Sequence, residues 1–445
     1  MKRIVSICIL LLVVLSGIST IVVTGNSGPT SWQGTSGAEL LSIDEDTPIE
    51  VIEENLVFNF REIVDEGYTI SSWITASYEM HNTSKETENS MMTFPMISFN
   101  PINREDIQIT VDGEKVEYEL HPHSAYEDEN REFSNIVENI QSDYRKDTIF
   151  NGLTDGSLWT LNLRTSSSEY EEITLDLMFD PSKTQLLTDG FNSGHYEYGH
   201  VVIGADLKDG DEAYVYFKGD KPVMELSENA SINVENMSFK DYYNTYIVSR
   251  INNDNKQYND VSLFNMLVER LQVYVYNQSS VVDIEQLVAI LEGEQIVSAN
   301  YEVPFEPGQT RTVEVSYKVK ASMKNKAYGG REDAAYTFEY FLSPAKSWLE
   351  FGELNVDILI NETLWQIEDS SLTLESVASG YRHTFQGLPE EDLFITLTRQ
   401  QTTKSVDVDS EAIGLNEWAT FTVAIAIFCC LVFIGLLLLK GRGKL

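Results

Sequence analysis

Cysteine is scarce in this chain, and its placement excludes several kinds of site. Three cysteines occur in 445 residues, Cys8 near the start and Cys429 and Cys430 near the end. The long stretch between them therefore has no disulfide, no zinc–thiolate site and no cysteine nucleophile. A folded region of this length buries enough apolar surface to be stable without disulfides.

Basic residues are also few. Lys and Arg number 31 against 70 Asp and Glu, so the formal net charge is −39. This balance excludes nucleic acid as a natural partner, because binding to phosphates needs basic patches. A charge of this size is typical of a soluble, self-repelling exposed surface. We predict no cofactor. With so many carboxylates, binding of a divalent cation stays open, although a high net charge does not by itself form a binding site.

Familiar catalytic motifs are missing as well. Residues 190–194 read Gly-Phe-Asn-Ser-Gly, which places the serine one position late for a Gly-x-Ser-x-Gly nucleophile elbow. The chain has no glycine-rich phosphate loop and no His-Glu-x-x-His zinc motif. These absences favour a non-enzymatic protein over an enzyme, and we predict no catalytic residue.

The N-terminal end of the sequence contains an apolar segment. Two basic residues precede an apolar run over 4–15, and small residues follow it. This is the pattern of a secretory signal, so residues 1–25 are predicted to be a signal peptide or an uncleaved signal anchor. Residues 26–40, rich in Ser, Gly and Thr, read as a linker. The remainder of the chain is therefore expected to be exported.

The C-terminal end predicts a membrane anchor. Residues 418–439 carry no charge and are long enough for one transmembrane helix. Basic residues follow at once, which predicts a cytoplasmic C-terminus, and the tail over 440–445 is too short to fold. The acidic linker over 401–417 lacks a Leu-Pro-x-Thr-Gly sorting sequence, so we expect the anchor to be retained. The side chains expected at the membrane interface are Trp418, Lys440, Arg442 and Lys444.

Between the two ends, apolar and polar residues alternate with a period of two. Clear examples are 74–80, 173–179 and 313–319. Such strands have one apolar and one wet face, as in antiparallel sheets. Asp112-Gly113 between two of these strands predicts a hairpin, and Pro307-Gly308 predicts a turn. Short strands joined by turns indicate β-sandwiches.

Helical spacing replaces this alternation in three places. Apolar residues recur every three or four positions over 133–144, 264–275 and 284–291, and Asp283 is placed to cap the last helix. We expect each apolar stripe to pack on the protein's own sheets. The alternative is that the helical pair over 260–293 is an insert that docks a partner.

These patterns together predict a fold class that is mainly β. We expect a β-sandwich-like ectodomain of two domains with helical insertions, followed by one C-terminal transmembrane helix. The expected ranges are a β-rich domain over 41–225 with a helical insertion near 131–146, a helical connector over 226–300, and a β-sandwich domain over 301–400.

Two histidine clusters contain residue types that bind zinc. His121 and His123 end a predicted strand and have acidic residues close behind. The second cluster is His195, Glu197 and His200. On a strand His195 and Glu197 share a face, whereas His200 points to the other face unless the glycine before it bends the chain. The spacing in both clusters is loose for a dedicated zinc site.

Acidic and asparagine residues give weaker site predictions. Asp206, Asp209 and Asp211 surround a glycine and could supply oxygen ligands to calcium, although they lack the spacing of a dedicated calcium loop and favour a solvated turn. Glycosylation sequons begin at Asn82, Asn229, Asn236, Asn277 and Asn361.

Two aromatic, turn-containing segments carry a family resemblance. They are Tyr336–Leu354, with its Phe-Leu-Ser-Pro-Ala-Lys-Ser-Trp core, and Tyr381–Leu393, with Gly-Leu-Pro. They resemble the closing portion of uncharacterised membrane-anchored surface proteins of bacteria and archaea with β-sandwich ectodomains. The resemblance implies a location and a fold and brings no catalytic residue.

The sequence therefore predicts a membrane-anchored extracytoplasmic protein of binding, structural or accessory-subunit type. Its expected partners are the membrane, through the single span, and an envelope protein or surface polymer. The alternative is a metal-dependent extracytoplasmic hydrolase that uses one of the His/acidic clusters.

Overall fold

The computed structural model describes most of the chain between the two apolar ends. The predicted signal segment, the acidic linker and the predicted span lie outside the described residues. In the part that the structure describes, no helix is both long and apolar enough to cross a bilayer. The described residues are 31–44, 46–98, 102–124, 134–145, 155–164, 168–251, 257–277, 281–291, 295–325 and 334–400.

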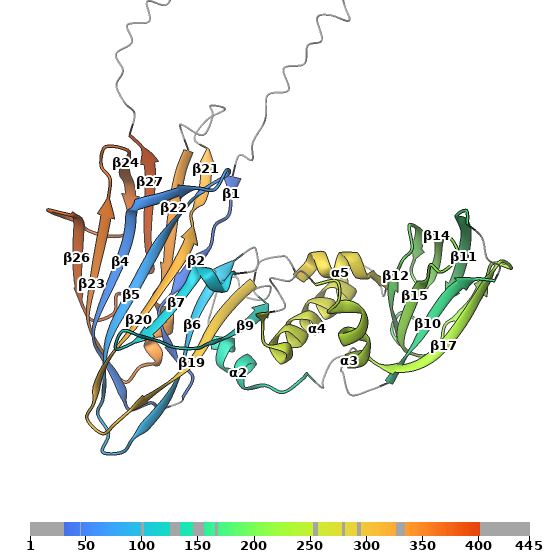
Figure 1. The fold of residues 1–445 in the computed structure, drawn as a ribbon, viewed down its shortest axis with the longest axis horizontal. Coiled ribbons are helices and arrows are strands. Elements are labelled where there is room, and N and C mark those ends of the chain that lie inside the picture. The colour runs from blue at the N-terminus through green and yellow to red at the C-terminus, as the bar shows by residue number, and fades with distance from the viewer. Residues whose placement is uncertain are drawn as a thin grey trace, which may run out of the picture. The chain divides into compact units, whose positions relative to one another are not determined.

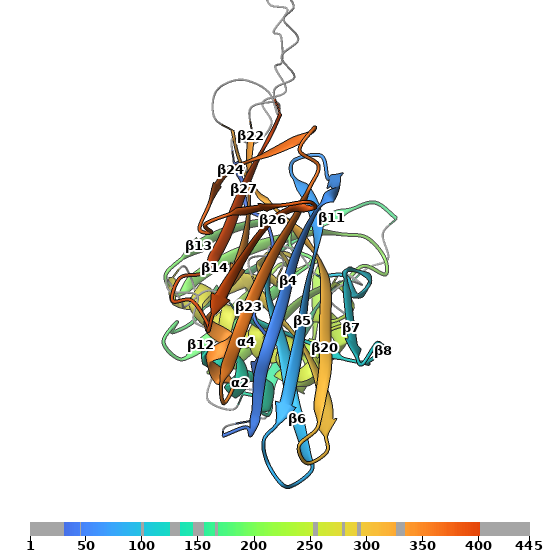
Figure 2. The same ribbon diagram turned by 90° about the vertical axis from the view of Figure 1, so that its left-hand side faces the viewer.

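A large sandwich is built from two sheets (Figures 1 and 2). Figure 2 shows β23, β4, β5 and β20 of sheet B side by side. Sheet A contains β1 (Ser31–Trp32), β2 (Ser36–Ala38), β3 (Leu41–Ser42), β6 (Glu88–Ser98), β9 (Glu119–Ser124), β19 (Gln295–Phe305), β21 (Ser322–Asn325), β22 (Ala334–Phe341), β24 (Trp365–Ser370) and β27 (Leu393–Arg399). Sheet B contains β4 (Ile49–Asp65), β5 (Ile70–Asn82), β7 (Ile107–Val111), β8 (Glu114–Lys115), β20 (Thr310–Lys320), β23 (Phe351–Ile360), β25 (Glu375–Val377) and β26 (Gly380–Gln386).

The alternating residues of these strands form the core between the sheets. On β20, Val313, Val315 and Val319 are fully buried, as the period of two predicts. Aromatic rings join the two sheets, with the centroids of Phe60 and Phe338 4.7 Å apart. Contacts of this kind add to the apolar burial that stabilises the sandwich.

Local turn chemistry agrees with the sequence. Asp112 and Gly113 both have positive φ, 53° and 84°, and link β7 to β8 in the predicted hairpin. Gly308 has φ of 67° in the predicted turn before β20, where the Gln309 amide donates to the Glu306 carbonyl at 2.9 Å. Both turn predictions are confirmed.

A long insertion separates two neighbouring strands of sheet A. The chain leaves after β9 and returns at β19, although Ser124 pairs with Gln295. The residues between them form a small sandwich and a set of helices (Figure 1). Sheet C contains β10 (Asp155–Leu163), β12 (Thr184–Asp189), β15 (Ala213–Gly219), β17 (Ala230–Ser238) and β18 (Val281–Asp283). Sheet D contains β11 (Glu171–Met178), β13 (Ser193–Glu197), β14 (His200–Leu207) and β16 (Val223–Leu226).

The predicted helices form close to their predicted positions. They are α2 (Ser134–Gln141), α4 (Asp260–Asn277) and α5 (Ile284–Leu291), with the short α3 (Phe239–Tyr242) running into a π-helical turn, η2 (Tyr243–Ile247). Two 3₁₀ turns are η1 (Arg104–Asp106) and η5 (Ser343–Ser347). Asp283 accepts a hydrogen bond from the Glu285 amide at 2.8 Å, so it caps α5 as predicted.

The apolar stripes of α4 and α5 pack inside the protein. Phe264, Leu267, Leu271 and Leu287 are fully buried in the same core cluster as the large sandwich. Among the described side chains of these helices, the predicted packing on the protein's own sheets is confirmed. The alternative of a partner-docking insert would have needed these same side chains to be exposed.

The mainly β fold class with several sheets is confirmed, but the predicted domain ranges do not follow the sheets. Strands within 41–225 and within 301–400 share both sheets of the large sandwich; for example β4 pairs with β23 in parallel. The predicted connector over 226–300 also begins with β17 before any helix. Local alternation shows that a strand exists but not which distant strand it pairs with, which explains the difference.

Candidate functional site

Sheet D has one buried face and one open face. On β11, Ile173, Leu175 and Leu177 point inward and are fully buried against sheet C. The residues between them point outward and are half-buried or exposed. By contrast, sheet C is covered on its second face, where Tyr216 stacks on Tyr242 of α3 at 4.5 Å. We define the outward residues of sheet D as its open face.

Strand register arranges the open face in rows across four strands. The first row runs from β13 to β16 as Glu197, His200, Met178 and Val223. The second row runs in the same direction as His195, Val202, Asp176 and Glu225. Residues paired directly across antiparallel strands share a face, so these eight side chains form one surface.

A glycine turn brings His200 onto this surface. Gly199 has φ of 77° and, with Tyr198, reverses the chain between β13 and β14. His200 therefore lies opposite Glu197 instead of continuing the same strand. The sequence left this point open, and the structure resolves it: His195, Glu197 and His200 share one face because the chain bends.

The two histidines on the open face each pair with a different carboxylate. His195 Nε2 lies 3.1 Å from Glu197 Oε1, and both side chains are more than half exposed. His200 Nε2 lies 2.9 Å from Asp176 Oδ1, with 40% and 38% of the side chains exposed. Exposed pairs of this kind stabilise a fold by at most about 1 kcal/mol.

An apolar strip lies beside these pairs. Met178 is 51% exposed and Val223 63% exposed, and they are direct cross-strand neighbours. Tyr198, in the adjacent turn, is 88% exposed, and the Gly199 carbonyl accepts a hydrogen bond from the Phe179 amide at 2.9 Å. A group of large apolar side chains left exposed on an ordered sheet is typical of an interaction site. The sequence analysis missed this strip, because its residues come from three separate segments.

The other predicted histidine cluster is structural. His121 Nδ1 lies 2.8 Å from the Ser262 hydroxyl of α4, and His123 Nε2 lies 2.8 Å from the Ser298 hydroxyl of β19. Burial lowers the pKa of His123 to about 3, helped by the neighbouring His121, and burial also lowers the pKa of His121 against the opposing effect of Glu119. Neutral imidazoles that are bonded to serines in this way hold α4 and β19 to β9.

The described residues do not form a metal-binding group at the predicted clusters. Within the described ranges, no group of three or more His, Cys, Asp or Glu side chains is placed to hold a metal ion. Asp206 accepts a hydrogen bond from the Asn192 amide group at 2.7 Å, while Asp211 accepts from the Lys208 backbone at 3.2 Å in the turn after β14. These contacts fit the solvated turn that the sequence favoured, with Asp209 at its tip.

The asparagines of the predicted glycosylation sequons differ in how exposed they are. The Asn82 side chain is fully buried and donates to the carbonyls of Glu86 and Phe305, so a glycan at Asn82 is incompatible with the fold. Asn236 is exposed, while Asn229 and Asn361 are half-buried. The side chain of Asn277 and the predicted interface residues Trp418, Lys440, Arg442 and Lys444 lie outside what the structure describes.

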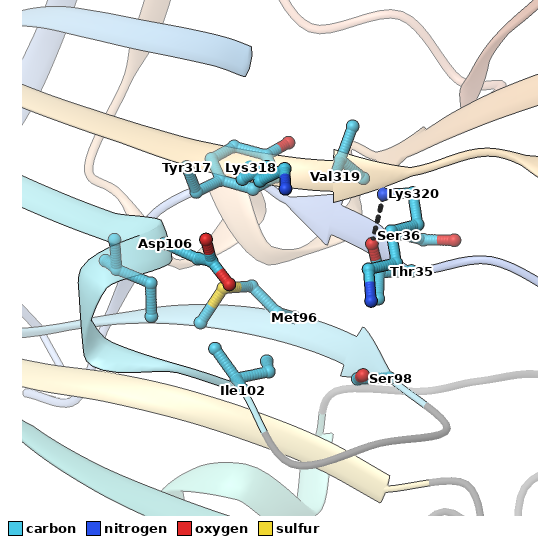
Figure 3. A pocket seen from close by; sticks show the side chains of 11 residues that line it. Thr35, Ser36, Met96, Ser98, Ile102, Asp106, Tyr317, Lys318, Val319 and Lys320 are labelled. Carbon is cyan, nitrogen blue, oxygen red and sulfur yellow. Dashed lines mark hydrogen bonds between the residues drawn. The ribbon is translucent and has the colours of Figure 1, made fainter. Parts of the chain in front are cut away.

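Two hollows are defined by the described residues. One, of about 50 Å³, is shown in Figure 3 and lies between the segment at Thr35, strand β6, η1 and β20. It has room for about one water molecule. Asp106 lines it, and partial burial raises the pKa of that carboxyl. The other, of about 420 Å³, is a polar hollow beside Arg61, whose guanidinium donates to the Ser379 carbonyl at 2.7 Å.

The chain has no recognised family relative, and its similarity to a solved structure is distant. No family model matches the chain, and no curated protein matches it. Among solved structures, the chain is similar to a Legionella pneumophila protein named for a proposed nutrient-binding role. The TM-score is 0.34 at 9% identity, over 83% of this chain and 73% of that one.

Proposed function

We propose that the chain is a membrane-anchored extracytoplasmic binding protein that holds a protein partner on the open face of sheet D. The observation that carries the proposal is the exposed Met178–Val223 pair on an otherwise ordered four-stranded sheet, with the exposed Tyr198 in the turn at the same end of the strands. The membrane anchor and the location rest on the sequence, through the apolar segments 1–25 and 418–439.

The partner should have a basic area beside an apolar patch. Besides the two His–carboxylate pairs, the open face carries Glu172, Asp206 and Glu225, all exposed. Protein interfaces combine an apolar centre with a polar rim, and complementary charge speeds and orients association. An acidic area beside the Met178–Val223 pair therefore favours a basic envelope protein over a neutral surface polymer.

The fold supports this role by the way it presents the sheet. The small sandwich sits in an insertion between two adjacent strands, so its sheets are additional to those that close the large sandwich. One face of sheet D packs in the core of the small sandwich, and the other face is exposed. A rigid sheet offers a preformed surface, which reduces the ordering entropy lost on binding.

Co-purification from gently solubilised membranes tests the proposal. The full chain with both Met178→Glu and Val223→Glu should fold normally, because both sites are exposed, but should place two charges at the centre of the interface. The matched control is Leu364→Glu, since Leu364 is 58% exposed in a turn of the large sandwich.

The expected result is a partner that co-purifies with the wild type and with the control. We expect its recovery with the double variant to fall at least about tenfold, which corresponds to a loss of about 1.4 kcal/mol. Recovery should also fall as salt is raised, because the rim is charged. Equal recovery with the double variant and the wild type would refute the proposal.

A further inference from the structure

The polar hollow beside Arg61 lies at one end of sheet B in the large sandwich. Its walls come from three segments that are far apart in the sequence: Arg61 of β4, residues 360–362 at the end of β23, and residues 376–380 of the hairpin between β25 and β26. These strands are neighbours in the sheet, in the order β26, β23, β4 (Figure 2). The volume of about 420 Å³ is within the range of pockets that bind small ligands.

Two irregularities of the sheet form this hollow. The pairing of β4 with β5 is interrupted between Asn59 and Val64, where four residues of β4 (60–63) lie opposite a single residue of β5. A bulge of this kind bends a strand and redirects its side chains, and here it contains Arg61. β23 ends at Ile360, and the chain then turns away from β4. The sheet therefore stops beside Arg61 and leaves space next to it.

The hairpin on the other side of the hollow depends on a glycine. Gly380 has φ of 141°, and a Cβ built on it would lie 2.0 Å from the Ile358 carbonyl oxygen of β23. Only glycine allows the hairpin to approach β23 this closely. The turn of the hairpin offers the Ser379 carbonyl, which accepts from the Arg61 guanidinium at 2.7 Å. Arg61 therefore reaches past the end of β23, and its head group is held in place.

Arg61 has no carboxylate to balance its charge. Within the part of the chain that the structure describes, no carboxylate lies within ion-pair distance of Arg61, whereas five other arginines are paired with one: Arg145, Arg250, Arg311, Arg382 and Arg399. In a chain with 70 acidic and 31 basic residues, this is unexpected. A guanidinium has five N–H donors, so the contact with Ser379 leaves others for a ligand.

The other polar groups of the hollow suit hydroxyl groups. Glu362 supplies a carboxylate that accepts hydrogen bonds, and Ser376 and Ser379 supply hydroxyls that donate or accept. The Asn361 side-chain oxygen accepts from the Thr363 amide at 3.2 Å and from the Thr363 hydroxyl at 2.7 Å, which holds its amide group in place. The hollow thus combines one cationic donor with several groups that bind neutral hydroxyls.

We propose that this hollow binds an anionic sugar, with Arg61 holding the carboxylate of the ligand. A guanidinium binds a carboxylate through two parallel hydrogen bonds, which gives strength and orientation. Glu362, Asn361 and the two serines bind the ring hydroxyls. A bare anion would use Arg61 alone, and a neutral sugar would leave the guanidinium without a charge partner. The ligand class is therefore a sugar acid, either free or as one unit of an acidic surface polymer.

Calorimetric titration of the full chain, purified in mild detergent, tests this inference. The probes are glucuronate, a glucuronate oligomer, glucose and acetate, in about 0.15 M salt. Glucuronate should bind, and glucose and acetate should each bind at least about tenfold more weakly, because each lacks one part of the interaction. Tighter binding of the oligomer per sugar unit would identify a polymer as the source of the ligand, and equal binding would identify the free sugar acid. Both results support the inference.

An arginine variant tests the role of the guanidinium. Arg61→Gln should weaken glucuronate binding at least about tenfold and remove its advantage over glucose. The control is Arg311→Gln at the other end of sheet B, where Arg311 lies opposite Met80, and Met80 lies opposite Val51 of β4. This control should bind glucuronate like the wild type.

Several results would overturn the inference. One is a wild type that binds neither glucuronate nor its oligomer, and another is equal glucuronate binding by the wild type and Arg61→Gln. Acetate binding as tight as glucuronate binding would show a bare anion site and contradict a sugar ligand. Because Asn361 begins a sequon, the intact mass of the chain is also measured: a glycan on Asn361 without glucuronate binding would assign the hollow to that glycan. The wild-type comparison of glucuronate with glucose decides the matter even if Arg61→Gln does not fold.

Discussion

The packing of α4 gives a prediction whose magnitude follows from the structure. Leu271 is fully buried on α4, and the next residue, Gln272, is exposed. Leu271→Ala should remove several methyl and methylene groups from the core and leave a cavity. Such a change at a fully buried leucine destabilises a protein by about 3–5 kcal/mol. Gln272→Ala, one position along the same helix, should change stability by no more than about 0.5 kcal/mol.

Thermal unfolding of the full chain measures this difference. An unfolding entropy of about 2 cal/mol/K per residue, over a chain of this size, converts 3–5 kcal/mol into a melting temperature lower by about 3–6 °C. We expect Gln272→Ala to melt within about 1 °C of the wild type. Both variants should retain their partner, because α4 is not part of the open face of sheet D.

Equal melting temperatures for the two variants would refute the reasoning. That outcome would mean that the apolar stripe of α4 is not packed inside the protein. If Leu271→Ala also lost its partner while keeping its melting temperature, the helices would be the docking surface and the open face of sheet D would not.

Two further predictions concern the buried carboxyls and the glycine turn. Burial raises the pKa of Glu39 from 4.5 to about 7, so between these pH values the folded chain binds more protons than the unfolded chain. The free energy of unfolding should therefore fall as pH rises through that window, by on the order of 3 kcal/mol from Glu39 alone. Chemical denaturation at several pH values measures this change, and no slope in the window would contradict it. Gly199→Ala should lower stability by about 1–2 kcal/mol, because φ is 77° and the new Cβ would lie 2.7 Å from the Phe179 carbonyl oxygen. Melting of this variant next to a Gly113→Ala control, where nothing lies within 4 Å, separates the contact from the backbone strain.

Local features of the fold could be predicted from the sequence. The period-two alternation located β5, β11 and β20, and the apolar spacing located α4 and α5, because each signal lies within one element. Pairing between distant elements could not be predicted. The parallel pairing of β4 with β23, and the return of the chain at β19 beside β9, depend on residues separated by long stretches of sequence. Alternation is the same whichever strand lies alongside.

The candidate sites show the same division between local and distant signals. His195, Glu197 and His200 could be found because they lie within six residues of one another. Asp176 and the Met178–Val223 strip lie next to these residues only because of how the strands pair, which the sequence does not reveal. Glu54 had a local signal that was missed: it precedes Leu56, Phe58 and Phe60 at the same period of two, so it faces inward with them. A carboxyl group in an inward apolar series marks a position that needs a special partner.

Site-specific crosslinking on intact cells tests the central claim most directly. A photoreactive amino acid at Val223, on the open face of sheet D, should crosslink one defined basic protein. The same amino acid at Leu364, equally exposed on the large sandwich, should not crosslink it. The Val223 adduct should weaken when Met178→Glu is added and when salt is raised. An identical adduct from both positions, or only monomer from Val223 under every condition, would contradict the claim that this face binds the partner.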